Sequence, residues 1–330
     1  MNGPRILPLA LLGFACSRAD VVLYCAADQE HAQPIVRTFE ERTGLSVRAV
    51  FDVEAAKTVG LVRTLLEEKD HPRCDVFWNN EIAHMIRLRA EGILAPYASS
   101  SAAGIPAEFR HPEGYWTGFA ARGRVLVVHD PSVPEAERPR SLRDLADPRW
   151  KGKTAIARPI TGTTLTHFAA LFEAWGEERA RAFCEALLGN EVNLTSGNAV
   201  VARKVGDGVF AFGLTDTDDV ESQRRNGKPV SAVFPDGEGA GTLLIPNTVA
   251  LIRGGPNPEN GRRLVDFLLS PEVEMRLAFS ASANIPVRVD VETPPGVRRL
   301  GSFRRMFVDW YAVAGRLDAR LEEMNRIFVR

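Results

Sequence analysis

The fold is decided by residues 21–78, which read VVLYCAADQEHAQPIVRTFEERTGLSVRAVFDVEAAKTVGLVRTLLEEKDHPRCDVFW. Three short apolar runs in this stretch are typical of buried strands, and the two segments between them carry apolar residues at helical spacing. In chain order, the five segments are 21–24, 33–43, 46–51, 58–69 and 74–78, and a further helix is predicted through Ile82, Met85 and Leu88. Strand and helix alternate, which predicts a parallel sheet flanked by helices.

A second block of the same kind follows from about Gly118. Its predicted strands are 124–129, 154–157, 209–214 and 242–252, and its predicted helices are 163–175, 178–188, 199–205, 261–269 and 303–327. The chain has 330 residues, about twice the length of a typical ~150-residue domain. The sequence therefore predicts an α/β protein of two lobes, with several chain crossings between them.

The charge balance argues against a nucleic-acid partner. The 41 Lys and Arg residues almost equal the 42 Asp and Glu residues, which leaves a formal net charge of -1. Nucleic-acid binders usually carry a basic excess or a basic stripe. The four cysteines, at positions 16, 25, 74 and 184, match no zinc or redox spacing, so a framework of disulfides is not expected, although a single bridge is possible.

The N-terminal residues are typical of an export signal. Arg5 precedes an apolar run over 6–15, which is too short to span a bilayer but suits a secretory signal sequence. We expect a signal over residues 1–19, or a lipoprotein signal that ends at residue 15 and leaves Cys16 for lipidation. Either predicts a periplasmic or extracytoplasmic protein, with a lipid anchor at Cys16 in the lipoprotein case; the alternative is a buried N-terminal strand or helix.

Polar loops follow several of the predicted strands, where ligands lie in open parallel sheets. The candidate ligand-binding residues are Asp28, Asn80, Glu81, Arg122, Thr161, Gly162, Thr163, Thr164, Asn198, Asp216, Thr217, Asp218 and Asp219. The run at 161–164 precedes a helix, so its amides and hydroxyls suit an anion, or Thr simply caps the helix. Arg122, beside Gly123 and Arg124, suits a phosphate or carboxylate.

The run TDTDD at 215–219 places three carboxylates directly after an apolar strand. Such a cluster calls for compensation by water, a metal, an Arg or a cationic ligand group, unless it is only a solvated helix start. Enzyme motifs are missing from the sequence: there is no Gly-x-Ser-x-Gly elbow, Walker A sequence or Gly-x-Gly-x-x-Gly. We therefore expect no enzyme; the remote alternative is a periplasmic hydrolase that pairs Glu81 with Asp218.

Taken in order, several motifs resemble the ferric-iron-binding-protein-like branch of the periplasmic (extracellular) solute-binding proteins of ABC importers. They are VVLY at 21–24, FEERTG at 39–44, DVFW at 75–78, LADPRWKGK at 145–153, TGT at 161–163, Asn198 ahead of Asp207-Gly208, and FLLS at 267–270 before Pro271-Glu272. The resemblance covers nearly all of the chain after the signal. It implies a non-catalytic monomer of two lobes with mixed sheets, a cleft that closes by hinge motion, and a membrane ABC permease as partner.

The same resemblance implies lobe boundaries. Lobe 1 would comprise 20–118 plus about 249–290, and lobe 2 would comprise 119–248 plus about 291–330, with hinge strands crossing near 116–124 and 241–250. Thr161, Gly162, Thr163 and Asn198 match the positions where iron-binding relatives hold a synergistic anion. Asp28 falls near their first-loop His ligand, and Asn80, with Glu81 next to it, falls at their Glu ligand.

The chain departs from that branch at Thr217-Asp218-Asp219, where the ferric-binding relatives carry adjacent tyrosines. We therefore expect the cargo to be a small polar anion, such as a phosphorylated compound or a phosphonate, bound by 161–164 and Arg122. Asp216, Asp218 and Asp219 would then receive its amine or hydroxyls. The alternative is Fe(III) or another hard cation, held by Asp28, Glu81, Asp218 and Asp219 with an anion. No cofactor is required in either case.

Overall fold

The structure is a computed structural model that describes residues 19–52 and 59–329. The predicted signal up to residue 18, including Cys16, and the predicted helix start at Thr58 lie outside these residues. Within the described ranges, no helix combines the length and the apolarity that a membrane span requires.

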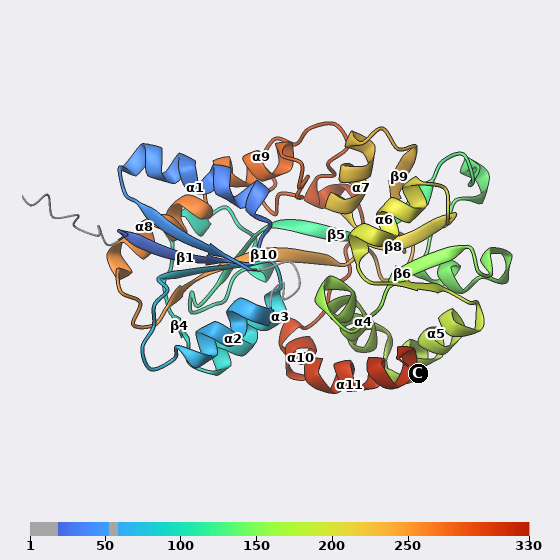
Figure 1. Cartoon of the computed structure of the whole chain (residues 1–330), viewed down its shortest axis with the longest axis horizontal. Coiled ribbons are helices and arrows are strands. Elements are labelled where there is room, and N and C mark those ends of the chain that lie inside the picture. The colour runs from blue at the N-terminus through green and yellow to red at the C-terminus, as the bar shows by residue number, and fades with distance from the viewer. Residues whose placement is uncertain (1–18, 53–58, 330) are drawn as a thin grey trace, which may run out of the picture.

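The first lobe is built on a sheet in the order β2-β1-β3-β10 (Figure 1). Strands β1 (Val21–Cys25), β2 (Val47–Phe51) and β3 (Val76–Asn79) are parallel, and β10 (Leu244–Ile252) runs antiparallel beside β3 and pairs the short β4 (Leu94–Ala95). Every residue of β1 is buried, because helices cover both faces of the sheet. That burial explains the uninterrupted apolar run with which the strand begins.

Two separate apolar clusters lie on the two faces of this sheet. One face is covered by α1 (Gln29–Thr43), α8 (Pro258–Leu268) and α9 (Pro271–Phe279), and the other by α2 (Val59–Glu67) and α3 (Ile82–Ala90). Helix α1 ends at Gly44, whose φ of 70° lies in the left-handed region that glycine adopts without strain.

The second lobe repeats this layering around the order β5-β8-β6-β7, with β9 paired to β5. Its strands are β5 (Thr117–His129), β6 (Thr154–Ala157), β7 (Asn193–Thr195), β8 (Phe212–Asp216) and β9 (Val230–Val233). Helices α4 (Gly162–Trp175), α5 (Glu177–Gly189) and α11 (Leu317–Phe328) cover one face, and α6 (Asn198–Gly206) and α7 (Thr217–Arg225) cover the other. Short 3-10 helices occur at Ser100–Ala102, Ala107–Phe109, Glu135–Glu137, Leu142–Ala146, Pro148–Trp150 and Leu300–Ser302.

Strand β5 belongs to both lobes. Its first half, through Gly123, pairs with β10, and from Arg124 onward it pairs with β8 and β9. In Figure 1, β5 and β10 run side by side through the middle of the molecule. The two-lobed α/β fold with mixed sheets and crossing strands is therefore as the sequence predicts.

The C-terminal segment differs from the single helix predicted over 303–327. Two helices form instead, α10 (Trp310–Gly315) and α11. Asp309 starts α10 by accepting hydrogen bonds from the backbone N–H groups of Tyr311 and Ala312. The residues before it are extended, because Arg305 forms a parallel β-bridge with Thr242. Trp310 packs against apolar clusters of both lobes, so this segment joins the lobes a third time.

Candidate functional site

A small polar cavity lies between the two lobes and brings several of the predicted site residues together. Its volume is about 30 Å³, and its lining includes Asp28 and Asn80 from the first lobe, Arg122 from β5, and Asp218 from the second lobe. The remaining lining residues are Ala27, His31, Trp78, Asn247, Leu277, Ser282 and Asn284. A cavity of this size admits an ion or about two water-sized groups.

A larger hollow of about 820 Å³ lies on the second lobe, lined by residues that include Arg140, Arg143, Trp175 and Arg179. Its three arginine side chains are exposed to solvent. The interlobe cavity is the better candidate, because both lobes contribute to it and because buried charges of both signs surround it.

Asp216 is the last residue of β8, and its buried carboxylate is enclosed by donors of the second lobe. Arg124 donates to Oδ1 from Nη1 over 2.7 Å. Oδ2 accepts from the Thr163 hydroxyl at 2.7 Å and from Nδ2 of Asn198 at 3.1 Å. Burial by itself raises the pKa of Asp216, but the guanidinium groups of Arg124 and Arg122 outweigh it and hold the pKa below its ordinary value.

The threonine run divides into an exposed part and a buried part. Thr163 and Thr164 are buried, and both hydroxyls also accept hydrogen bonds from Arg124, at 3.1 and 3.2 Å. Thr164 in turn donates to Oδ1 of Asn198 over 2.9 Å. Thr161 and Gly162 are exposed at the start of α4, and the Thr161 side chain makes no capping hydrogen bond. Two of the three hydroxyls expected to bind an anion, those of Thr163 and Thr164, are thus used within the protein.

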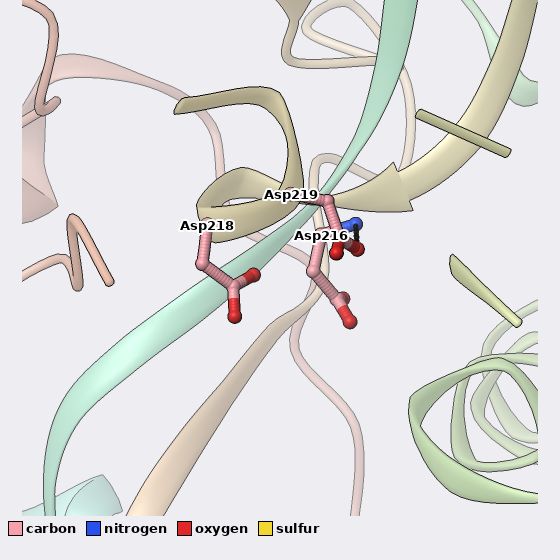
Figure 2. A group of neighbouring side chains, drawn as sticks. All are labelled: Asp216, Asp218 and Asp219. Atoms are coloured by element: carbon pink, nitrogen blue, oxygen red, sulfur yellow. Dashed lines mark hydrogen bonds between the residues drawn. The ribbon is translucent and has the colours of Figure 1, made fainter. Parts of the chain in front are cut away.

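Figure 2 shows that the three aspartates point in different directions. Asp219 turns back to close a capping box: its Oδ2 accepts from the Thr215 hydroxyl at 2.7 Å and from the backbone N–H of Asp216 at 3.4 Å. Asp218 stands apart from this pair on the first turn of α7 and lines the cavity. Thr217 takes no part in the cavity lining, because its hydroxyl accepts from the backbone N–H of Gly123 at 3.1 Å.

Asp218 and Asp219 both resist ionisation. Oδ1 of Asp218 is buried and meets no hydrogen-bond donor among the described residues. Burial, followed by the charge of Asp219, raises the pKa of Asp218 well above its ordinary value. Burial and the charge of Asp216 raise the pKa of Asp219 to about 6. One ligand atom from each of Asp216, Asp218 and Asp219 lies within 4.8 Å of the others.

Arg122 faces the carboxylates from the first half of β5. Its Nη1 lies 3.8 Å from Oδ2 of Asp216 and 3.9 Å from Oδ2 of Asp218, and its Nη2 donates to the backbone carbonyl of Asn80 over 2.9 Å. Burial opposes its charge, yet Asp216 and Asp218 raise the pKa of Arg122 above its ordinary value. Its separation from both carboxylates exceeds hydrogen-bond length, so it balances their charge without occupying their lone pairs.

Glu81 links the two lobes. It precedes α3 in the first lobe, and its Oε2 accepts from the hydroxyl of Thr166 on α4 in the second lobe at 2.8 Å. Oε1 is buried and has no partner among the described residues. Burial raises the pKa of Glu81 to about 7, against the opposing effect of Arg122.

The structure adds residues that the sequence interpretation missed. Thr166 was overlooked although it follows Thr163 by one helical turn. Asn247 interrupts the apolar strand β10, where an isolated amide was a usable signal. Its Oδ1 accepts from Nε1 of Trp78 at 3.1 Å beside the cavity. Arg124, considered only as the neighbour of Arg122, is the fully buried centre of the donor set.

Two α/β lobes with a polar cavity between them are the architecture of a solute-binding protein of the ABC-importer type. The chain belongs to the family described as bacterial extracellular solute-binding protein, whose pattern matches residues 77–309. Within that family it is a ferric-iron-binding-protein-like member. Proteins of this family work outside the cytoplasmic membrane, in the periplasm or an equivalent compartment.

Three similar proteins illustrate the relationship. Iron uptake protein A1 of Synechocystis sp. is 26% identical over 297 residues, which cover 86% of this chain and 80% of that protein. The structure of a Trichodesmium protein in complex with iron and citrate has a TM-score of 0.81 at 23% identity and covers 94% of this chain and 99% of the other. The periplasmic binding protein AfuA from Actinobacillus pleuropneumoniae, with fructose-6-phosphate bound, has a TM-score of 0.80 at 21% identity, covering 95% and 99%.

Proposed function

We propose that this chain is the substrate-binding component of an ABC importer and that its cargo is ferric iron or another hard cation. The observation that carries the proposal is Asp218. Its carboxylate lines the interlobe cavity with a buried oxygen that meets no donor among the described residues. An acceptor in that position suits a cation, which needs lone pairs and has no hydrogen to donate.

The charge around the cavity supports the same cargo. Within the described ranges, five carboxyl groups interact with two guanidinium groups; the set comprises Asp28, Glu81, Asp216, Asp218, Asp219, Arg122 and Arg124. Burial raises the pKa values of Glu81, Asp218 and Asp219, and the neighbouring carboxylates raise them further. A hard cation would relieve the surplus, whereas an anion would add to it.

The relatives are consistent with a metal cargo. One curated relative is an iron uptake protein, and a structural neighbour was solved with iron and citrate. The tyrosine pair of the ferric-binding branch is replaced here by Asp218 and Asp219. Carboxylate oxygens are hard ligands like phenolates, so the replacement changes the ligand set without changing the class of cation it suits.

A phosphorylated or phosphonate cargo, which the sequence alone favoured, is the second candidate. The structural neighbour AfuA, which was solved with fructose-6-phosphate bound, supports this candidate. Two features weigh against it: Thr163, Thr164 and Asn198 already donate to partners within the protein, and the cavity of about 30 Å³ is smaller than a sugar phosphate.

A thermal-shift panel tests the proposal, because a ligand that binds only the native state raises the melting temperature. The panel comprises ferric nitrilotriacetate, ferric citrate, aminoethylphosphonate and hexose phosphates. We expect the ferric compounds to raise the melting temperature of the wild type by several degrees and that of Asp218→Asn much less. Asp290→Asn is the matched control, since Asp290 is exposed and lies outside the cavity lining.

The outcomes separate the alternatives. A shift with phosphonates or hexose phosphates and none with ferric compounds would establish the second candidate. Turnover of glycosides or phosphoesters that disappears in Asp218→Asn would establish the hydrolase instead.

A further inference from the structure

The Asp216 carboxylate lies where three helices of the second lobe begin. Thr163 belongs to the first turn of α4, Asn198 is the first residue of α6, and Asp216 itself is the N-cap of α7. Helix N-termini present unpaired N–H groups and the positive end of the helix dipole, so their convergence favours a negative charge. The fold therefore builds an anion-binding pocket at this point.

The side chains around the pocket complete an anion-binding donor set. A guanidinium from Arg124, a hydroxyl from Thr163 and an amide from Asn198 all donate to the two oxygens of Asp216. Arginine with hydroxyl and amide donors at a helix start is the set that binds free carboxylate, carbonate or phosphate. Here the ligand of that set is a side chain of the same protein.

The pocket is filled and closed. Arg124 has no exposed surface, and Asp216 and Thr163 are 3% and 4% exposed. A second anion would have to displace the Asp216 carboxylate, which is attached to the backbone at the end of β8 and paired there with Arg124 of β5. Tethering removes the entropy loss that a free anion pays on binding.

The tethered carboxylate also lies beside the proposed cation site. One of its oxygens is within 4.8 Å of ligand atoms of Asp218 and Asp219, and Oδ2 is 3.8 Å from Arg122. Its negative charge therefore remains next to the cavity when no solute anion is present.

We infer that Asp216 is a built-in anion: its side chain fills the anion pocket of the second lobe, so cation capture by this chain needs no separate anion from solution. The inference rests on the proposed function, because it assigns a role in cation binding. It makes Asp216 a residue that determines whether binding depends on small anions. Removal of its carboxylate should create a vacant pocket and an anion-dependent protein.

The experiment compares wild type, Asp216→Ala and Asp216→Asn at mildly acidic pH, in chloride buffer with and without formate. Terbium(III), a hard cation that stays soluble without a chelating anion, serves as the probe, followed by its luminescence. We expect wild-type affinity to change less than about twofold with formate, and Asp216→Ala to lose about tenfold or more and regain most of it with formate. Asp216→Asn should stay weak, because the amide fills the pocket and excludes formate.

A second measurement needs no metal. Formate should raise the melting temperature of Asp216→Ala more than that of the wild type or of Asp216→Asn, since Arg124 then recovers a counter-ion. Wild-type binding that appears only with formate would overturn the inference and leave the proposed function standing. Absence of terbium and ferric binding under every condition would overturn both. Loss of binding in a folded Asp216→Ala that formate neither restores nor stabilises would also refute the built-in anion.

Discussion

At the scale of single residues, Arg124 is a charged side chain that the protein holds out of contact with solvent. Its side chain is completely buried, and it donates to Asp216, Thr163, Thr164 and Nδ1 of His167. His167 accepts that bond as a neutral ring, since burial and then the charge of Arg124 hold its pKa well below the ordinary value. A guanidinium is tolerated inside a protein only when such partners replace its water.

Arg124→Met should therefore be strongly destabilising. The change leaves the buried Asp216 carboxylate without its main counter-ion, and breaking a buried pair typically costs about 3–5 kcal/mol. Urea unfolding measures the loss in the free energy of unfolding. Arg122→Met is the matched control and should cost less, because Arg122 contacts its carboxylates at 3.8 and 3.9 Å and is partly exposed. Equal losses in the two variants would contradict this account.

Glu81 should make stability depend on pH. Its pKa rises from 4.5 to about 7 on folding because of burial, so the folded protein holds a proton that the unfolded chain releases between these values. The free energy of unfolding should then fall as pH rises from about 4.5 to 7, by roughly 1–3 kcal/mol. Unfolding curves across this range should lose that component in Glu81→Gln. An unchanged pH profile in the variant would show that other groups cause it.

At the scale of elements, the sequence predicts which segments carry polar side chains but not how those side chains divide their tasks. TDTDD reads as a loop after a strand, yet β8 extends through Asp216 because Thr215 and Asp216 pair with Val125 and Arg124 of β5. Asp218 and Asp219 then fall in the first turn of α7. Asp216 differs from the other two aspartates because it pairs with Arg124, which lies 92 positions away in the sequence. Local sequence patterns hold no information over that distance.

The order of strands and helices was predictable because the pattern that specifies it is local in the sequence. Strand β1 is buried on both faces, and α1 buries Ala32, Ile35, Val36 and Phe39 on one side. Burial on that scale leaves a periodic apolar pattern that can be read without knowing the partners. The start of the C-terminal helices could not be predicted in this way. It depends on the Asp309 cap and on the β-bridge that Arg305 forms with the distant Thr242.

Gly213 in β8 should tolerate no side chain. A Cβ added there would lie 2.5 Å from the Ala155 carbonyl oxygen and 2.5 Å from Cγ1 of Val201. Gly213→Ala should therefore separate α6 from the sheet and destabilise the second lobe by about 1–3 kcal/mol or more. Gly189→Ala in α5 is the control, since no atom lies within 4 Å of its added Cβ. Chemical denaturation of both variants checks the contrast, and a neutral Gly213→Ala would disprove it.

At the scale of the whole molecule, several contacts among the described residues hold the lobes together. Strands β5 and β10 pass between them, α10 contacts α3 and α4, and Thr166 of α4 donates a hydrogen bond to Glu81 at the start of α3. The lobes are thus joined on several sides of a cavity that both of them line. Closure of such a cleft is a balance between these contacts and the freedom of the open form.

Trp310→Ala should shift that balance toward an open cleft, because Trp310 packs against apolar clusters of both lobes. Small-angle X-ray scattering of the cargo-free variant should give a larger radius of gyration than the wild type. Apparent cargo affinity should fall about three- to tenfold, since the closed form is less populated. Trp175→Ala, whose ring packs within the second lobe against Phe183, should leave the radius unchanged. A wild-type radius in Trp310→Ala would rule out the bridging role.

The passage of β5 from one lobe to the other has a consequence for how this protein can evolve. Arg122, Gly123 and Arg124 follow one another at the point where the strand changes partners, and alternate residues of a strand share a side. Arg122 lines the cavity and Arg124 binds Asp216, so a substitution in this short segment changes both the charge of the site and the strand that joins the lobes. A descendant that changes its cargo site at Asp28 or Asp218 leaves β5 intact, whereas one that changes it at Arg122 alters the crossing strand in the same step.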